Sequence, residues 1–316
     1  MKERSSHFGR ETRAIEAVSG IDLSGKRAIV TGASSGIEIE TARALAAAGC
    51  EVILAVRNRD AGERSAKAMM DEFGGGPPAV ASLDLSDLKA IEIFARSECS
   101  KPLDILICNA AVMACPFGRT RDGFELQLGV NHVGHAILVK RLLPALRLAA
   151  AARVVMVSSS AHWWASFDFD DPNCDRKPYD KFKAYGQSKT ANILYAIAFN
   201  QRFSLQGITA NALMPGNIMT ALGRHLSSED YKTLGIDGKH SLFVKNVEQG
   251  AATSVWAAVA PELEARGGLY LEDCQVAPPA APERPGVGAA PYARDPGSAE
   301  HLWEWTESLD AARRSN

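Results

Sequence analysis

Residues 31–40 read TGASSGIEIE, and this stretch decides the fold. The apolar run that ends at Thr31 is followed by Gly32, which permits a tight turn, and then by Gly36 and a helical pattern over Glu38–Ala48. Such a turn points free backbone N–H groups and the positive end of a helix dipole at one spot, where a dinucleotide diphosphate can bind. The same turn can also have a purely structural role, so evidence from the rest of the chain is needed to tell whether it binds a nucleotide.

Apolar runs alternate with helical patterns along most of the chain. Runs without polar alternation are typical of strands covered on both faces, and the long segments between them suit crossover helices. We predict an α/β protein with a Rossmann-type, doubly wound, seven-stranded parallel sheet in three layers. The expected strands are Arg27–Thr31, Glu51–Val56, Ala79–Leu83, Ile105–Cys108, Val154–Val157, Ile208–Leu213 and Gly268–Leu271.

The chain divides into one large domain and two flanking segments. A run rich in proline and glycine at 277–291 disfavours regular structure, and a helical pattern over Ala299–Ala312 follows it. Within the large domain, 221–241 has few large apolar residues and is a candidate lid over the substrate. We expect an N-terminal arm over 1–24, a single Rossmann-type domain over 25–275 with substrate loops at 160–184 and 217–245, and a proline-rich linker with a C-terminal helix over 276–316.

Composition argues against several classes of protein. The 316 residues include 35 basic and 37 acidic side chains, a formal net charge of −2, so counterion release offers little for binding nucleic acid. No apolar run approaches the roughly 18 residues of a membrane span, and the polar N-terminus lacks the apolar stretch of a signal peptide. The six scattered cysteines form no CxxC pair and suit reduced thiols. We expect a cytoplasmic protein without a metal site, in which His132, His135 and His162 are structural.

The end of the second strand, AVRNRD, bears on which nucleotide binds. An acid in place of Val56 would bind a ribose hydroxyl and repel a 2′-phosphate, whereas Arg57 can pair with that phosphate. Arg57 can equally be a solvated surface arginine. Asp84, after the third strand, can accept a hydrogen bond from an adenine amino group or cap the helix that follows. The pattern favours NADP(H) over NAD(H).

Residues 185–189 read YGQSK, and on a helix Tyr185 and Lys189 share one face. A phenol with its ordinary pKa of about 10 exchanges protons poorly near neutrality, but a neighbouring ammonium group lowers that pKa. The tyrosine can then protonate a developing alkoxide, or take the proton from an alcohol in the reverse reaction. The YxxxK spacing alone is common on helix surfaces, and it gains weight here from the nucleotide loop and from VVMVSSSAH upstream.

Six motifs together resemble those of the short-chain dehydrogenase/reductase family, in the order found there. They are TGASSGI at 31–37, CNAA at 108–111, NHVGH at 131–135, VSSSAH at 157–162, YGQSK at 185–189 and LMPGNIMT at 213–220. The resemblance covers roughly residues 22–275. Two longer stretches, GITANALMPGNIMT and QGAATSVWAAVAPELEARGGLYLEDC, resemble the retinol-dehydrogenase-like branch of that family.

The resemblance implies a role for several of these residues. Tyr185 would donate or accept the proton, and Lys189 would lower its pKa and hold the nicotinamide ribose. Ser159 would bond the substrate oxygen, and Asn131 would fix the lysine and a relay water. The residues expected to bind the cofactor are Gly32, Ser34, Ser35, Gly36, Ile37, Arg57, Asn58, Asp84, Leu85, Asn109, Ala110, Ala111, Tyr185, Lys189, Pro215, Gly216, Ile218 and Thr220.

The resemblance further predicts an NADP(H)-dependent oxidoreductase that interconverts a ketone or aldehyde and an alcohol on a fairly apolar small molecule. Trp163, Trp164 and Phe167 either wall that apolar pocket or pack their loop onto the body of the protein. The family also implies a homodimer or homotetramer, formed through the helices that carry Phe124–Leu146 and Tyr185–Phe203. The alternatives are a non-redox isomerase or cyclase on the same fold, and a nucleotide-sensing or scaffolding protein.

Glu38 stands where the family has a glycine that lets the helix pack closely beside the diphosphate. In the first turn of a helix a carboxylate is favoured by the dipole, so the fold tolerates it. The same charge would repel a dinucleotide by roughly 3 kcal/mol at about 6 Å and an effective dielectric near 20. That repulsion is on the order of a hundredfold in affinity, and it shrinks if the side chain swings outward. We therefore expect a working cofactor site that an inward-facing Glu38 weakens.

Overall fold

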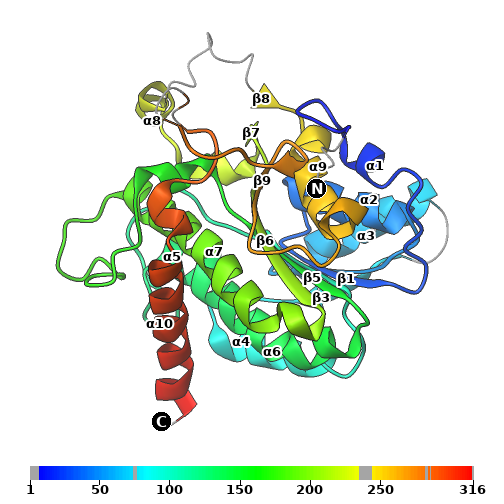
Figure 1. Ribbon diagram of the computed structural model, residues 1–316, viewed down its shortest axis with the longest axis horizontal. Helices are drawn as coiled ribbons and strands as arrows, with labels where there is room; N and C mark the ends of the chain where they lie inside the picture. Colours follow the sequence, from blue (N-terminus) through cyan, green and yellow to red (C-terminus); the bar gives the residue numbers. More distant parts are fainter. Residues whose placement is uncertain (1–6, 74–76, 235–243, 282–283, 285, 315–316) are drawn as a thin grey trace.

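A central sheet forms the middle layer of the protein (Figure 1). The computed structural model describes residues 7–73, 77–234, 244–281, 284 and 286–314. Eight strands lie in the order β10-β9-β6-β5-β4-β1-β2-β3, and every neighbouring pair is parallel except β9 with β10. They are β1 (Arg27–Thr31), β2 (Glu51–Val56), β3 (Ala79–Ser82), β4 (Ile105–Cys108), β5 (Ala152–Val157), β6 (Ile208–Met214), β9 (Tyr270–Glu272) and β10 (Gln275–Val276). A separate parallel pair joins β7 (Asn217–Ile218) to β8 (Val244–Lys245).

The predicted Rossmann-type sheet is confirmed, with one strand more than the seven expected. The additional strand, β10, pairs antiparallel with β9 at the edge of the sheet. Asp273 and Cys274 join the two strands with φ of 49° and 57°. Tight hairpin turns need this left-handed backbone and usually take glycine or asparagine there, so a turn made of Asp and Cys left no recognisable signal in the sequence.

Helices cover both faces of the sheet and complete the three predicted layers (Figure 1). Alternate residues of β1 point to opposite sides, because Ala28 and Val30 belong to one core cluster and Ile29 to the other. No helix within the described ranges is both long and apolar enough to cross a bilayer. One face carries α1 (Ala14–Ala17), α2 (Gly36–Ala47), α3 (Arg59–Phe73) and α9 (Val247–Val259), and the other carries α4 (Leu88–Glu98), α6 (Gly134–Leu148) and α7 (Lys181–Phe203).

The helix expected over Phe124–Leu146 is not continuous. Glu125 caps a short α5 (Leu126–Leu128) by accepting hydrogen bonds from two backbone N–H groups. A π-helical turn, Gly129–Val133, then leads into α6. A wider turn of this kind is frequent at functional sites, and it carries Asn131 here. The other short elements are α8 (Ser228–Thr233) and 3₁₀ turns at Ser160–Trp164, Ser204–Gln206, Ala221–His225, Pro261–Leu263 and Pro291–Arg294.

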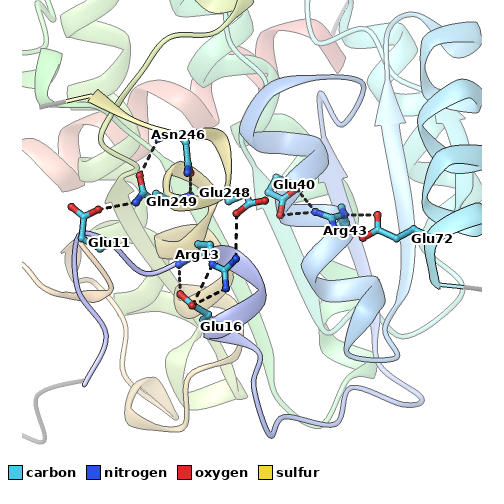
Figure 2. Close-up of polar contacts among 9 residues, drawn as sticks. All are labelled: Glu11, Arg13, Glu16, Glu40, Arg43, Glu72, Asn246, Glu248 and Gln249. Carbon is cyan, nitrogen blue, oxygen red and sulfur yellow. Dashed lines mark hydrogen bonds and ion pairs between the residues drawn. The ribbon is translucent and has the colours of Figure 1, made fainter. Parts of the chain in front are cut away.

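The segment before β1 is tied to the start of α9 by polar contacts (Figure 2). Gln249 Nε2 donates a hydrogen bond to Glu11 Oε2 at 2.8 Å, and a guanidinium nitrogen of Arg13 lies 3.9 Å from a Glu248 oxygen. Gln275 of the edge strand also donates to the Phe8 carbonyl at 3.0 Å. The described part of the expected N-terminal arm is therefore docked on the sheet domain.

The C-terminal helix α10 (Pro296–Arg314) lies along α7 and includes the expected Ala299–Ala312 (Figure 1). The Trp303 ring stacks on Tyr195 of α7 with 5.5 Å between ring centroids, and Arg141 of α6 forms an ion pair with Asp310. The family resemblance implied that subunits associate through the helices α6 and α7. In this chain α10 covers part of that layer.

Candidate active site

The glycine turn between β1 and α2 is held by the end of the neighbouring strand β4. Thr31 Oγ1 accepts hydrogen bonds from the backbone N–H groups of Asn109 and Ala110 at 2.9 and 3.0 Å. Gly32 has φ of 78°, and a Cβ there would lie 2.9 Å from the Ala110 Cβ, so glycine is required. Gly36 then begins the 12-residue helix α2. A close-packed turn at a helix start is the geometry that binds a diphosphate.

A cleft of about 210 Å³ lies beside this turn. Its walls come from the carboxyl ends of β1, β2 and β3, from the segment after β4, and from the chain after β7. Ligands of doubly wound sheets bind at this edge. Of the residues expected to bind the cofactor, those that line the cleft are Gly32, Ser34, Ser35, Gly36, Arg57, Asn58, Asp84, Leu85, Ala110, Ala111 and Thr220.

Other expected cofactor residues do not line the cleft, and they are Ile37, Asn109, Tyr185, Lys189, Pro215, Gly216 and Ile218. Ile37 and Ile218 pack against Gly250 of α9, where an added Cβ would lie 2.8 and 2.6 Å from them. Gly216 has φ of 114° and adjoins the aliphatic stem of Lys245, 2.6 Å from where its Cβ would be. These residues shape the backbone behind the cleft.

The polar groups around the cleft fit an NAD(P) dinucleotide. Asn109 Nδ2 is buried and has no hydrogen-bond partner among the described residues, which leaves a donor beside Ala110 for a ligand. Arg57 and Asn58 line the cleft at the end of β2, and the strand ends in Val56 rather than an acid. A 2′-phosphate would therefore meet a guanidinium group and no carboxylate at this strand end.

Asp84 lines the cleft and does not cap the next helix. Its Oδ1 accepts hydrogen bonds from the backbone N–H and the hydroxyl of Ser86, at 2.9 and 2.6 Å. Asp87 caps α4 instead, by accepting from the N–H groups of Lys89 and Ala90. Of the two alternatives for Asp84, helix capping is wrong, and contact with a bound nucleotide stays a prediction.

Ser159, Tyr185 and Lys189 are brought together where β5 ends. The tyrosine and the lysine are only 3% and 2% exposed on α7, and Nζ of Lys189 lies 5.5 Å from the centroid of the tyrosine ring. The ammonium group donates a hydrogen bond to the Val157 carbonyl at 3.0 Å. Ser159 follows two residues later, and its side chain lies close enough to the phenol to lower the pKa of Tyr185. A carbonyl oxygen placed there would meet two hydroxyl donors.

Burial controls the protonation of this cluster. It raises the pKa of Tyr185 above the ordinary value of a phenol, against the lowering effect of the Ser159 hydrogen bond, and the Glu38 charge raises it further. Burial lowers the pKa of Lys189 to about 8, and Glu38 opposes that shift. The pKa of Tyr185 is therefore raised by desolvation, and not lowered as was expected from the neighbouring Lys189 ammonium group.

Asn131 is fully buried in the π-helical turn and bonds to the residue before the lysine. Its Nδ2 donates to Ser188 Oγ at 3.0 Å and to the Val112 carbonyl at 2.9 Å, while Oδ1 accepts from the Val112 N–H. Its carbonyl faces Nδ1 of His135 at 3.1 Å. Asn131 thus contacts the Ser188 side chain next to Lys189 rather than the lysine itself, and its relay role stays a prediction.

His162 connects Ser159 to the C-terminal segment, a role that the sequence did not indicate. Its Nε2 accepts a hydrogen bond from the Ala290 N–H at 2.9 Å, so the proton is on Nδ1, which donates to the Ser159 carbonyl at 2.6 Å. The hydroxyl of Tyr292 donates to the His162 carbonyl at 2.7 Å. Burial lowers the pKa of His162 to about 4, and the ring is neutral near pH 7.

The other two histidines are also buried within the fold. Burial lowers the pKa of His132 to about 4 and that of His135 to about 3. Nδ1 of His135 donates to a carbonyl, so Nε2 accepts from the Thr31 hydroxyl at 2.9 Å. In the part of the chain that the structure describes, no three potential ligands gather to hold a metal ion.

The three aromatic residues that follow Ser159 have different surroundings. Trp163 donates its indole N–H to the Gly288 carbonyl at 3.0 Å, and Phe167 packs edge-on against Trp305. Trp164 is 40% exposed, and its ring lies 6.3 Å from the Tyr185 ring. Two of the aromatics thus pack the loop onto the body, and Trp164 alone is left near the phenol.

The candidate lid is described only as far as residue 234, and 235–243 lie outside the described residues. Thr220 caps a 3₁₀ turn over Ala221–His225 by accepting from the Leu222 N–H at 3.3 Å. Arg224 of this turn lines the cleft opposite the glycine turn, and Lys181 of α7 pairs with Asp230 of α8. The described part of the lid therefore forms one wall of the cleft, and its movement stays a prediction.

The Glu38 side chain folds back toward the cleft. Its Oε2 lies 2.7 Å from the point where a Cβ on Gly36 would be. Burial raises the pKa of its carboxyl group to about 7, against the attraction of Lys189. Of the two orientations considered from the sequence, the structure has the inward one, which places the carboxyl group among the cleft-lining residues.

Comparisons with known proteins agree with this architecture. The sequence pattern described as short chain dehydrogenase matches residues 26–230. A protein of Streptomyces antibioticus named "Probable oxidoreductase" is 44% identical over 92% of this chain and 100% of its own. The WW domain-containing oxidoreductase of Danio rerio is 39% identical over 98% of this chain and 74% of its own.

A solved structure from Beutenbergia cavernae has a TM-score of 0.65 and 25% identity, over 79% of this chain and 96% of that one. It contains bound NADP at low occupancy. The matched family pattern, the identity to full-length relatives and the three-layer fold lead to one conclusion: this chain belongs to the short-chain dehydrogenase family of oxidoreductases.

Proposed function

We propose that this chain is an NADP(H)-dependent oxidoreductase that interconverts a ketone or aldehyde and an alcohol on a fairly apolar small molecule. The observation that carries the proposal is the convergence of Ser159, Tyr185 and Lys189 at the end of β5, in a fold whose sheet edge also forms a nucleotide cleft. The glycine turn, the free amide of Asn109 and the guanidinium of Arg57 would hold the dinucleotide.

The proposed roles follow from the protonation states. In the direction of reduction, Ser159 donates a hydrogen bond to the substrate carbonyl oxygen and Tyr185 transfers its phenolic proton to the same oxygen. The reduced nicotinamide, when bound, supplies the hydride. Burial keeps the phenol protonated before the reaction, and the nearby Lys189 ammonium stabilises the phenolate that is left afterwards.

Two features favour NADP(H) and an apolar substrate. Arg57 in the cleft, with no acid at the end of β2, suits a 2′-phosphate better than a free ribose hydroxyl. The exposed Trp164 ring near Tyr185 offers a flat apolar wall to a substrate. We further propose a small-molecule partner and a cytoplasmic location. A homodimer or homotetramer would have to form around α10.

The position of Glu38 favours one alternative, a protein that senses the nucleotide without turning it over. An NADPH absorbance assay with a panel of aryl and alkyl ketones and aldehydes separates the two. We expect turnover that falls on the order of 10³-fold in Tyr185→Phe, because general acid catalysis contributes about 10²–10⁴-fold. Tyr195→Phe, a buried phenol elsewhere on α7, is the control and should keep its activity. NADPH binding without turnover of any compound would favour the sensor and contradict the proposal.

A further inference from the structure

The carboxyl group of Glu38 lies over the glycine turn, inside the cleft assigned above to the dinucleotide. Its Oε2 comes within 2.7 Å of the Cβ position of Gly36, and the Thr220 methyl group lies 3.8 Å from the same point. The start of α2 is where a diphosphate would approach the helix, so Glu38 and that diphosphate would be neighbours.

Charged groups from several elements lie around the cleft that this carboxyl group lines. Lys189 on α7 attracts its negative charge, and that charge in turn raises the pKa values of Lys189 and Tyr185. Around the cleft, Arg57 follows β2, Arg224 lies on the turn beyond β7, and Asp84 follows β3. Desolvation outweighs the attraction of Lys189 and raises the pKa of Glu38 to about 7. Near pH 7 the free protein therefore holds this group roughly half protonated.

The two forms of Glu38 act on a diphosphate in opposite ways. A carboxylate only accepts hydrogen bonds, and its charge repels the phosphates. A protonated carboxyl group carries one O–H, which can donate a strong hydrogen bond to a phosphate oxygen in the same manner as the N–H groups of the turn. A bound diphosphate would therefore favour the protonated form.

We propose that Glu38 binds the dinucleotide as a neutral carboxylic acid that donates its O–H to a diphosphate oxygen, so that binding takes up a proton wherever the free protein holds Glu38 ionised. The inference rests on the proposed function, because it needs the NADP(H) diphosphate in this cleft. Glu38 then binds the diphosphate only when its carboxyl group is protonated. The family has a glycine at this position, which has no side chain to titrate.

Titration of the full chain with NADPH, followed by nicotinamide fluorescence from pH 6 to 8.5, tests the inference. The dissociation constant of the unchanged protein should rise about 30-fold over this range, as expected for one carboxyl group with a pKa near 7 that must be protonated. Glu38→Gln keeps the length and a donor but has no charge, so it should bind about 30-fold more tightly than the unchanged protein at pH 8.5 and equally at pH 6. The 2′-phosphate titrates near pH 6 in every variant, so the comparison between variants isolates Glu38.

A matched control removes a carboxylate from the same helix outside the cleft. Glu40 is buried, does not line the cleft, and pairs with Arg43 at 3.1 Å (Figure 2). Glu40→Gln should keep the pH dependence of the unchanged protein. Glu38→Gly restores the family residue. Its affinity for NADPH should vary with pH no more than the affinity of Glu38→Gln does.

Calorimetry in two buffers of different ionisation enthalpy counts the protons directly. Relative to Glu38→Gln, the unchanged protein should take up about 0.1 proton at pH 6 and about 0.9 at pH 8. Equal dissociation constants for the two proteins at every pH, or no additional proton uptake, would overturn the role of Glu38 and leave the proposed function intact. Failure of all variants to bind NADPH at any pH would refute the proposed function and this inference with it.

Discussion

The cleft beside the glycine turn and the residues around Ser159 are held in different ways. The cleft is built from residues that directly follow β1, β2, β3 and β4, and its pieces are recognisable as short motifs. The segment around Ser159 is held from the far end of the chain, because Trp163 and His162 bond to Gly288, Ala290 and Tyr292, across 125 to 130 residues. The residues of the cleft therefore come from short local motifs. The contacts that fix the residues around Ser159 instead join parts of the chain that are far apart in sequence.

The largest effect should come from removing the C-terminal helix. A chain that ends at Asp295 loses α10, including the buried Leu302 and the Trp303 ring that covers Tyr195. Exposing several large apolar side chains costs about 5 kcal/mol, so the melting temperature should fall by about 10 °C or more. Without α10 the exposed face of α7 should also make the protein self-associate, which size-exclusion chromatography detects. An unchanged melting temperature and elution volume would show that the fold does not depend on α10.

Removing the hydrogen bonds of the His162 ring should have the next largest effect on stability. His162→Leu leaves the Ala290 N–H buried without a partner and removes one of the two hydrogen bonds to the Ser159 carbonyl, which should cost about 1–3 kcal/mol in unfolding free energy. Denaturant unfolding at pH 7 measures it. His7→Leu, at an exposed position, is the control. A loss in His162→Leu as small as in the control would mean that the long-range bonds are not needed.

The same histidine predicts a pH dependence. Its folded pKa of about 4 is below the ordinary 6.5, so between these values the unfolded chain binds a proton that the folded protein does not. The stability that the neutral ring contributes is therefore complete above pH 6.5 and is lost as the pH falls toward 4, by up to about 1.4 kcal/mol per unit. The stability difference between the unchanged protein and His162→Leu should shrink from pH 7 to pH 5. A constant difference would contradict a buried neutral ring.

In the cleft, the sharpest single change is at Arg57. Arg57→Ala should weaken NADPH binding about 10- to 100-fold, because a hydrogen bond to a charged group contributes about 1.5–3 kcal/mol, and should leave NADH binding unchanged. Arg59→Ala, two residues on and paired with Glu63, is the control. Equal losses for NADPH and NADH would mean that Arg57 does not contact a 2′-phosphate.

The smallest expected effect is at the substrate wall. Trp164→Ala should raise KM for apolar ketones about 5- to 10-fold with kcat little changed, because it removes an apolar face without touching the proton donors. Steady-state kinetics with a long and a short alkyl ketone measures the effect, which should be larger for the long one. A fall in kcat with no change in KM would point instead to a shift of Tyr185.

The strands and the cleft-lining motifs could be predicted because their signals are local. A two-sided apolar run such as Ile105–Cys108 and a glycine turn such as Gly32 each have a short-range physical cause. The π-helical turn could not be predicted, because its apolar pattern is that of an α-helix. The bonds of His162 could not be found either, because nothing near Ala290 distinguishes the backbone N–H that the ring meets. The inward orientation of the Glu38 side chain could not be predicted, because it depends on packing that the sequence does not specify.

The most direct test of the central claim, hydride transfer beside Tyr185, uses NADPH with deuterium at the transferable C4 position and mass spectrometry of the product. The account predicts an alcohol that carries one deuterium from a ketone of the panel, and no such product above background in Tyr185→Phe. Saturating NADPH binding with no deuterium in any product, or deuterium transfer that is equally fast in Tyr185→Phe, would contradict it.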